Sequence, residues 1–318
     1  MRTPAQGLLP AKGRVGVNPA RIRLDFMRWR QAAPAYAMLV PGLAGLALFT
    51  YYPMAYSLFL SMFRRNVFTP TPVLAPLENY TRLVADPVFW LVIRNTLIYV
   101  GVSIPVTMVL GLALAILLNQ PLGWLRSAYR VATFYPTMIP MAAAGMLWVW
   151  LLNPGIGLVN YYLSKLGFPR VEWLYDMDWA LPAIIVTSVW KHFGYFLLIY
   201  LAGLQVIPSE LYEAASIEGA RFWHQLRYIT LPLVAPTTIF VVVVGVISSF
   251  QVFDLVHVMT QGGPADRTNV LVYYIYQQAF RFWDIGQAAA LTVIFVAGLL
   301  CIVTWILRTM ERRAFYEV

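Results

Sequence analysis

The polar residues whose types and spacing could do chemistry are few, and none of them forms a recognisable catalytic set. His192, His224 and His257 are scattered without the spacing of metal ligands, and neither His-Glu-x-x-His nor Gly-x-Ser-x-Gly occurs. The single cysteine, Cys301, excludes a disulfide within the chain and a cysteine-based metal site. The sequence therefore predicts no catalytic residue, no metal site and no cofactor bound by this chain.

A patch of polar and small residues lies between long apolar segments and is the strongest candidate for a binding element. It contains Glu213-Ala214-Ala215, Gly219-Ala220 and the run Ile229-Thr230-Leu231-Pro232. Small side chains let a partner approach a helix closely, and Glu213 would supply a charged anchor. An ordinary helix at the membrane interface is the alternative interpretation.

A second candidate set lies inside predicted membrane segments. Lys191 falls at the middle of an apolar run, where a charge costs about 2.5–3.5 kcal/mol on insertion scales. Such a residue either lines a passage or contacts a carbonyl or counter-ion within the bundle. Tyr195 shares its helix face. Phe250, Gln251 and Asp254 offer an aromatic face, an amide and a carboxylate, which together could bind a polar ligand, and Phe250 and Asp254 are expected on one helix face. The alternative interpretation is that these residues serve helix packing, with Asp254 as an acid at the membrane interface.

The composition indicates that membrane helices must position these residues. The chain has 318 residues, of which 60% are hydrophobic and only 12% charged, whereas soluble domains carry about 25% charged residues. The net charge of +9 comes without a basic stripe interleaved with aromatics, so we expect no nucleic-acid partner. The sequence predicts an all-α polytopic membrane protein in contact with membrane lipid.

Six apolar segments are long enough to cross about 30 Å of hydrocarbon as helices. They lie near residues 36–60, 95–118, 130–152, 179–204, 234–258 and 287–309. Residues 1–34 carry seven Lys or Arg, which places this segment in the cytoplasm by the positive-inside rule. Six spans then bring both termini to the cytoplasmic side, and the remaining 35–318 form one transmembrane domain.

The predicted cytoplasmic loop at 205–233 contains the small-residue patch. Pro208 suits the first turn of a helix, Ser209 is a candidate N-cap, and Glu210 and Glu213 favour the positive end of the helix dipole. These signals predict a short helix at 209–217, ended by Gly219 with a positive φ angle. A second amphipathic helix should follow, and Pro232 should mark re-entry into the membrane.

The loop resembles the EAA loop of ABC importer permeases, with each motif position at its proper spacing. Other stretches are similar to the sugar and glycerol-3-phosphate branch of that family, which includes maltose-type permeases. They are Leu77-Glu78-Asn79-Tyr80, Asp86-Pro87 with Phe89-Trp90, Asn95-Thr96, Asn153-Pro154-Gly155 with Gly157, Ala202-Gly203-Leu204-Gln205 before Ile207-Pro208, and Gly262-Gly263-Pro264. The resemblance covers about residues 35–315.

The resemblance implies a type I ABC importer permease with six helices and a cytoplasmic coupling helix. It implies an inner-membrane location and a carbohydrate cargo, with two ATPase subunits docked at Glu213, Ala214, Ala215, Gly219, Ala220, Ile229, Leu231 and Pro232. It also implies a second homologous permease, which would form a heterodimer with this chain, and a periplasmic or lipid-anchored binding protein. ATP and Mg would sit on the ATPase, which agrees with the lack of a Gly-x-x-x-x-Gly-Lys-Ser/Thr loop here.

Two other functions remain open from the sequence. One is an importer for glycerol 3-phosphate or its diesters, for which Lys191 in the path would suit an anion. The other is a channel or secondary transporter that works without ATP. A membrane enzyme would need a catalytic cluster that the sequence does not show.

Overall fold

The computed structural model of the protein describes residues 34, 36–64, 71–120 and 125–310. The chain divides into two compact units, residues 1–56 and 57–318. The predicted cytoplasmic segment at 1–34 lies outside the described residues, except for its last position. The described part is mostly helical, which confirms the predicted all-α class.

The described part of the first unit is an apolar helix. The helix begins at Tyr36, passes through a π-helical turn, η1 (Ala47–Tyr51), and continues as α2 (Tyr52–Ser61). In the π turn Tyr52 N donates to the Ala47 carbonyl five residues back. The segment Tyr36–Leu60 is long and apolar enough to span a membrane, which agrees with the first predicted span.

The second unit begins within α2, at Ser57, and a small substructure follows that helix. Strands β1 (Phe63–Arg64) and β2 (Val73–Leu74) pair antiparallel, and α3 (Glu78–Ala85) follows. Buried Asn79 donates from Nδ2 to the carbonyls of Ser61 (2.9 Å) and Phe63 (3.0 Å), so it fixes α3 against the hairpin.

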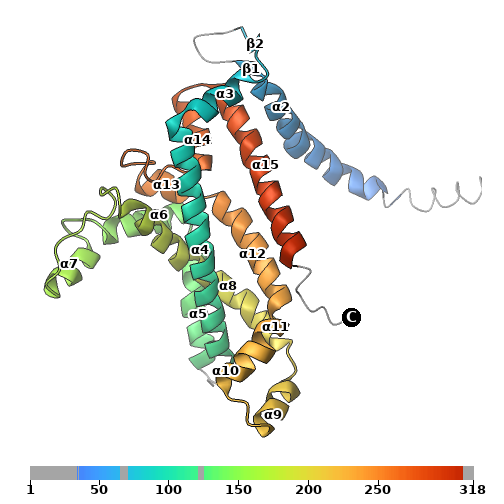
Figure 1. Ribbon diagram of the computed structural model, residues 1–318, viewed down its shortest axis with the longest axis vertical. Coiled ribbons are helices and arrows are strands. Elements are labelled where there is room, and N and C mark those ends of the chain that lie inside the picture. The colour runs from blue at the N-terminus through green and yellow to red at the C-terminus, as the bar shows by residue number, and fades with distance from the viewer. Residues whose placement is uncertain (1–33, 35, 65–70, 121–124, 311–318) are drawn as a thin grey trace, which may run out of the picture. The chain divides into compact units, whose positions relative to one another are not determined.

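Five further segments carry the long helices, and four of them come first. They are α4 (Pro87–Asn119), the pair α5 (Leu125–Met138) and α6 (Met141–Leu151), α8 (Ala180–Gln205), and α12 (Ala235–Phe250). The short α7 (Leu158–Lys165) lies between α6 and α8. After α12 come α13 (Asp254–Met259), α14 (Leu271–Tyr276), η3 (Gln277–Arg281) and the long α15 (Ile285–Met310). Figure 1 shows α4, α12 and α15 running lengthwise through this unit.

The structure modifies two of the six predicted spans. The third, at 130–152, is broken at Ile139-Pro140, where its two halves meet at 98°. The fifth, at 234–258, ends as a helix at Phe250, and its helix meets the preceding Phe222–Leu233 segment at 64°. Among the described residues four helices could each cross a membrane, or up to six if each bent pair is one span.

The core of the second unit forms where α4 packs along α8, with α12 against both. Small residues permit this close packing of apolar helices. A Cβ on Gly111 of α4 would lie 3.0 Å from the Phe196 Cβ, and a Cβ on Gly194 of α8 would overlap the Thr133 carbonyl of α5. Buried Tyr99 crosses from α4 to donate to Ser188 Oγ at 2.7 Å.

At the end of the second unit where α3 lies, buried polar side chains of α4 bind the loop that precedes α14. Asn95 of α4 donates to the carbonyls of Asp266 (2.8 Å) and Asn269 (3.1 Å), and Thr96 Oγ1 accepts from Leu271 N (2.9 Å). The Asn95-Thr96 pair therefore anchors the start of α14. These contacts give a structural role to Asn95 and Thr96, which are among the residues that carry the family resemblance.

Asp86 joins the same end of the unit to α4. Its carboxylate accepts from Val88 N at the start of α4 (2.9 Å) and from the Tyr274 hydroxyl (2.8 Å). Burial, together with the nearby Asp86 carboxylate, raises the pKa of the Tyr274 phenol. Tyr274 therefore stays a neutral hydrogen-bond donor.

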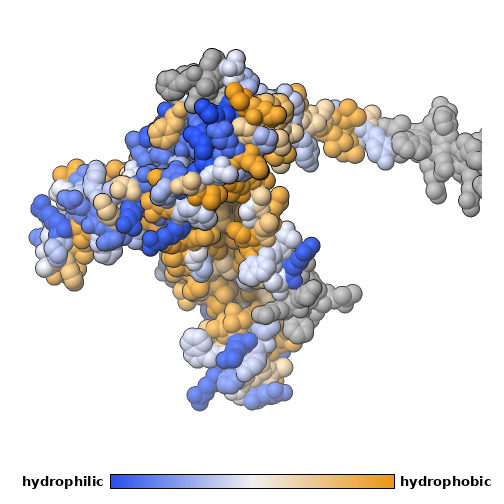
Figure 2. Space-filling model, turned by 45° about the horizontal axis from the view of Figure 1, so that its top comes forward, coloured by the Kyte–Doolittle hydropathy of each residue, from blue (hydrophilic) through white to orange (hydrophobic). Residues whose placement is uncertain are grey.

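Figure 2 shows how hydropathy is distributed over the second unit. Hydrophobic residues cover its middle, and hydrophilic residues gather around α3 and α7 and again at the end that carries α9 (Ser209–Ile217) and α10 (Phe222–Gln225). This distribution suits a bundle whose middle faces lipid and whose ends face water.

Candidate functional site

The short helix predicted at 209–217 is present as α9 (Ser209–Ile217). It is closed by hydrogen bonds from Gly219 N to the Ser216 carbonyl (3.1 Å) and from Ala220 N to the Ala215 carbonyl (2.8 Å). This pair of bonds is a Schellman motif, which needs a left-handed residue after the helix. Gly219 supplies it with φ +83°, as predicted.

The predicted N-cap is wrong by one residue. Ser209 lies inside α9, and Pro208, with φ −59° and ψ 133°, holds the capping position without a side-chain hydrogen bond. Proline precedes the helix because its fixed φ is compatible with the turn into α9.

A helix that contains a π-helical turn returns the chain from α9 to the bundle. It runs through α10, the π turn η2 (Leu226–Thr230) and α11 (Leu231–Leu233) without a gap, as predicted for the second amphipathic helix. Pro232 falls in its last turn, just before the 64° bend into α12. The run Ile229 to Pro232 thus forms the joint between the loop and the long helix.

Polar side chains brace α9 against this returning helix. The Tyr212 hydroxyl lies 3.0 Å from Thr230 Oγ1, and Gln225 Nε2 donates to Ser216 Oγ (2.9 Å) and to the Ala220 carbonyl (3.3 Å). Because Thr230 immediately precedes Leu231-Pro232, these contacts link α9 to the joint at the base of α12.

The outer face of α9 is open. No residue of α9 is buried; Glu213, Ala214 and Gly219 are exposed, and Ala215 and Ala220 are half-buried. Large apolar side chains are also exposed on α9 and on the returning helix, namely Leu211, Ile217, Phe222, Trp223 and Tyr228, with Ile217 87% exposed and Trp223 74% exposed. A surface that exposes both small residues and large apolar ones is one that a protein partner can cover.

The structure gives Lys191 a partner within the protein. Lys191 is only 5% exposed, and its Nζ donates to the Thr137 carbonyl at 2.6 Å. Thr137 Oγ1 in turn donates to the Lys191 carbonyl at 3.2 Å. The ammonium therefore satisfies a carbonyl at the end of α5, beside the 98° break, which is the carbonyl contact considered as one of its two roles.

A small polar cavity lies among α4, α8 and α12, near Lys191. Its volume is about 30 Å³, the space of one water molecule, and its polar lining residues are Ser103, Thr107, Ser188, His192, Tyr195, Ser248 and Ser249. Tyr195 and Ser248 are exposed, whereas Ser103 and Ser188 are buried, so the cavity opens on one side. Its hydroxyls and imidazole are groups that hydrogen-bond sugar hydroxyls.

His192 lines the cavity but was not among the predicted passage residues. It lies next to Lys191, and its Nδ1 donates to the Ser188 carbonyl at 2.8 Å, since a carbonyl can only accept. Its spacing of three residues from Tyr195 was the available signal.

The second predicted set does not come together. The helix expected to carry Phe250 and Asp254 on one face ends at Phe250, and α13 begins only at Asp254. Phe250 is 7% exposed in the core, whereas Gln251 and Asp254 are exposed. The shared-face prediction is therefore wrong, because the break at residues 251–253 resets the helical periodicity.

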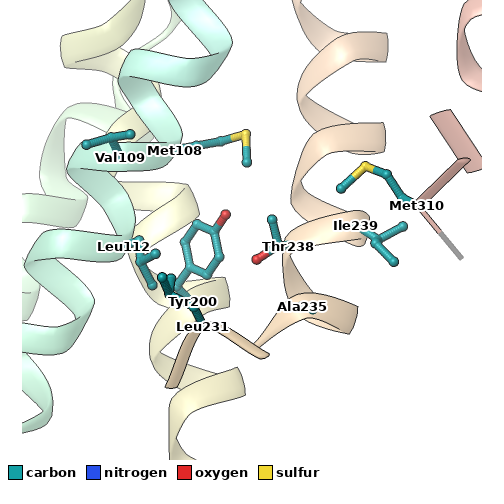
Figure 3. Close-up of a pocket in the computed structure, with 9 residues that line it drawn as sticks. All are labelled: Met108, Val109, Leu112, Tyr200, Leu231, Ala235, Thr238, Ile239 and Met310. Carbon is teal, nitrogen blue, oxygen red and sulfur yellow. The ribbon is translucent and has the colours of Figure 1, made fainter. Parts of the chain in front are cut away.

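A larger groove, drawn in Figure 3, is unsuited to a polar cargo. It has a volume of about 360 Å³ and lies between α4, α8 and the base of α12. Of its nine lining residues, only Tyr200 and Thr238 bring hydroxyl groups; the rest, including Met108 and Met310, are apolar.

Within the described residues no group of histidines, cysteines and carboxylates could hold a metal ion.

The family of the chain follows from comparison with known proteins. The model of the family described as "Binding-protein-dependent transport system inner membrane component" matches residues 107–316. The chain belongs to this family. It is an inner-membrane component of a transport system, and the matched range includes α9 and most of the residues that line the polar cavity, but not Ser103.

Several curated relatives are similar over almost the whole chain. The sulfoquinovosyl glycerol transport system permease protein SmoG of Agrobacterium fabrum is 34% identical, covering 88% of this chain and 91% of that protein. The sn-glycerol-3-phosphate transport system permease protein UgpA of Brucella abortus is 31% identical, covering 89% and 96%. The trehalose/maltose transport system permease protein MalF of Thermococcus litoralis is 33% identical, covering 82% and 87%.

A solved structure shares the fold. It is the crystal structure of a bacterial ABC transporter involved in the import of the acidic polysaccharide alginate, with a TM-score of 0.81 and 27% identity, covering 91% of this chain and 99% of that chain. A second structure of a bacterial alginate ABC transporter, in complex with an alginate pentasaccharide-bound periplasmic protein, matches equally well. The family and the fold confirm the predicted ABC importer permease.

Proposed function

We propose that this permease subunit of an ABC importer moves a carbohydrate across the bacterial inner membrane, driven by ATPase subunits that dock on α9. The observation that carries this proposal is the exposed, small-residue face of α9 at Glu213, Ala214 and Ala215. A transport component whose own sequence lacks a phosphate-binding loop needs such a face to receive work from another polypeptide.

The brace between α9 and the returning helix supports mechanical coupling. An ATPase that binds one arrangement of the bundle more tightly than another shifts the population between them by that difference in affinity. The contact between Tyr212 and Thr230 would carry the shift to Pro232 and α12. We place α9 and both termini in the cytoplasm, because residues 1–34 are rich in Lys and Arg.

The polar cavity is the proposed passage for cargo. Its open side, at Tyr195 and Ser248, calls for a second permease subunit that closes it, which fits a heterodimeric membrane core. At about 30 Å³ the cavity holds no sugar in this arrangement, so cargo would pass only when the helices separate. A periplasmic or lipid-anchored binding protein would deliver the cargo.

The choice of cargo rests on the relatives. They are named for the transport of sulfoquinovosyl glycerol, sn-glycerol 3-phosphate and trehalose/maltose, and the structural neighbour for the import of alginate. Carbohydrate is the class that most of these share. An importer of glycerol 3-phosphate is the second candidate, favoured by UgpA and by the buried charge of Lys191.

The direct test is purification of the chain from its native membrane in mild detergent, followed by mass spectrometry and uptake assays in liposomes. The proposal expects an ATPase with a phosphate-binding loop and a second homologous permease to co-purify, and uptake to require ATP. A chain that is purified alone and moves solute without ATP would instead be a channel or secondary transporter.

A further inference from the structure

Lys191 carries a buried charge that the described protein does not neutralise. Among the described residues the ion pairs are Arg64 with Glu78 and Arg82 with Asp284, so Lys191 has no carboxylate partner there. Its one hydrogen bond is to a neutral carbonyl, and it is 5% exposed. A carbonyl satisfies one N–H of an ammonium but leaves its net charge in place.

The position of Lys191 on α8 adjoins residues that line the cavity. Lys191 is one residue before His192 and one turn away from both Ser188 and Tyr195, all of which line the cavity. On an α-helix, residues three or four apart lie about 5–6 Å apart between Cβ atoms. The ammonium itself is held at the Thr137 carbonyl of α5, and its field reaches the cavity through the protein interior, where the effective dielectric constant is far below that of water.

The cavity itself contains nothing that opposes this charge. None of its lining residues is an acid. Ser103 Oγ, in a residue that is 2% exposed, has no hydrogen-bond partner among the described residues, so one donor is free for a cargo group. Hydroxyl donors around an uncompensated positive field suit a ligand that brings negative charge and oxygen acceptors.

We propose that Lys191 makes the passage selective for anionic carbohydrates, which carry a carboxylate, sulfonate, sulfate or phosphate group, over neutral ones. This inference rests on the proposed function for the position of the passage. Lys191 acts through its field on a group in the cavity, and its contact with Thr137 holds the charge in place. It is thus a specificity-determining positioning residue.

The test measures the charge preference of the cavity without knowledge of the cargo. Ser248→Cys is introduced into full-length chain in which Cys301 has been replaced by Ser, in membrane vesicles with its co-purifying partners. The thiol is treated with an anionic methanethiosulfonate (sulfonatoethyl) and a cationic one (trimethylammonioethyl), and the ratio of the two rates is recorded. The thiolate fraction cancels in this ratio, because both reagents attack the same thiolate.

The proposal expects a ratio that favours the anionic reagent and falls about tenfold in Lys191→Met, equivalent to about 1.4 kcal/mol. Lys191→Arg should keep the ratio, since it keeps the charge. A merely structural role would change both rates together and leave the ratio unmoved. A thiol at exposed Ser164 of α7 is the control, whose ratio should not respond to position 191.

Three results would overturn the proposal: a ratio unaffected by Lys191→Met, a wild-type preference for the cation, or a thiol at position 248 that neither reagent reaches. None of these contradicts ATP-driven uptake by the same membranes. Absence of ATP-driven uptake by membranes that contain the wild-type protein would instead refute the proposed function.

Discussion

Replacement of Gly219 by Ala tests whether the shape of α9 is needed for coupling. The residue has φ +83°, and a Cβ added there would meet nothing within 4 Å. The substitution therefore introduces backbone strain without a steric clash. A left-handed conformation costs an L-residue other than Gly about 1–2 kcal/mol, which is a factor of about 5–30 in a local equilibrium.

Hydrogen exchange of the loop peptides reads out this strain. The two bonds of the closing turn, from Gly219 N and Ala220 N, should open more often in Gly219→Ala, so exchange of the position-219 and Ala220 amides should accelerate by about that factor. ATPase recovered with the purified chain should fall in parallel. Gly219→Asn should have a smaller effect, because Asn tolerates the left-handed region better.

Gly167 provides a matched control in the same chain. It also has φ +83° and open space, and it ends α7 with the same two bonds, from Gly167 N to the Ser164 carbonyl and from Phe168 N to the Leu163 carbonyl. Gly167→Ala should strain α7 equally while ATPase recovery stays normal. Equal ATPase recovery in both variants would refute the reasoning that the geometry of α9 carries docking.

Three further substitutions test other parts of the account. Glu213→Ala should leave thermal stability unchanged, because Glu213 is exposed and forms no hydrogen bond or ion pair among the described residues, yet reduce the ATPase that co-purifies. Gly194→Ala would overlap the Thr133 carbonyl and should destabilise the bundle by about 1–3 kcal/mol, seen as a lower temperature of aggregation in detergent; Gly298→Ala, which meets nothing within 4 Å, should not. Asn95→Ala should cost about 1–3 kcal/mol, because the Asn269 carbonyl loses its side-chain donor and the Asp266 carbonyl is left with Asn269 N. It should also speed hydrogen exchange at residues 262–271, and unchanged exchange there would contradict the anchoring role of Asn95.

Local rules were enough to predict α9 and its end. A positive φ angle favours Gly, and Gly219 is the only glycine between residues 204 and 244. The long apolar runs likewise predicted α4, α8 and α15, because length and hydropathy are properties of the chain alone. The prediction of Ser209 as the N-cap was wrong, because Pro208 and Ser209 are adjacent and the sequence does not determine which of them takes the first helical φ and ψ angles.

The errors arose where contacts between distant residues decide the structure. Residues 250–254 contain no glycine or proline that would predict a break in the helix, so Phe250 and Asp254 were wrongly predicted to share one helix face. The partner of Lys191 lies 54 residues away at Thr137, and the inclusion of His192 in the cavity depends on how α4 and α12 approach α8. Periodicity assigns a residue to a face of its helix, but it does not say which element covers that face.

Crosslinking from α9 tests the central claim most directly. A photoreactive amino acid at exposed Ala214, activated in native membranes and followed by mass spectrometry, should give adducts with a polypeptide that carries a phosphate-binding loop. The same group at Ser164 on α7 should give none with that polypeptide. Adducts at position 214 with lipid alone, or with this chain alone, would contradict the assignment of α9 as the site where an ATPase drives transport.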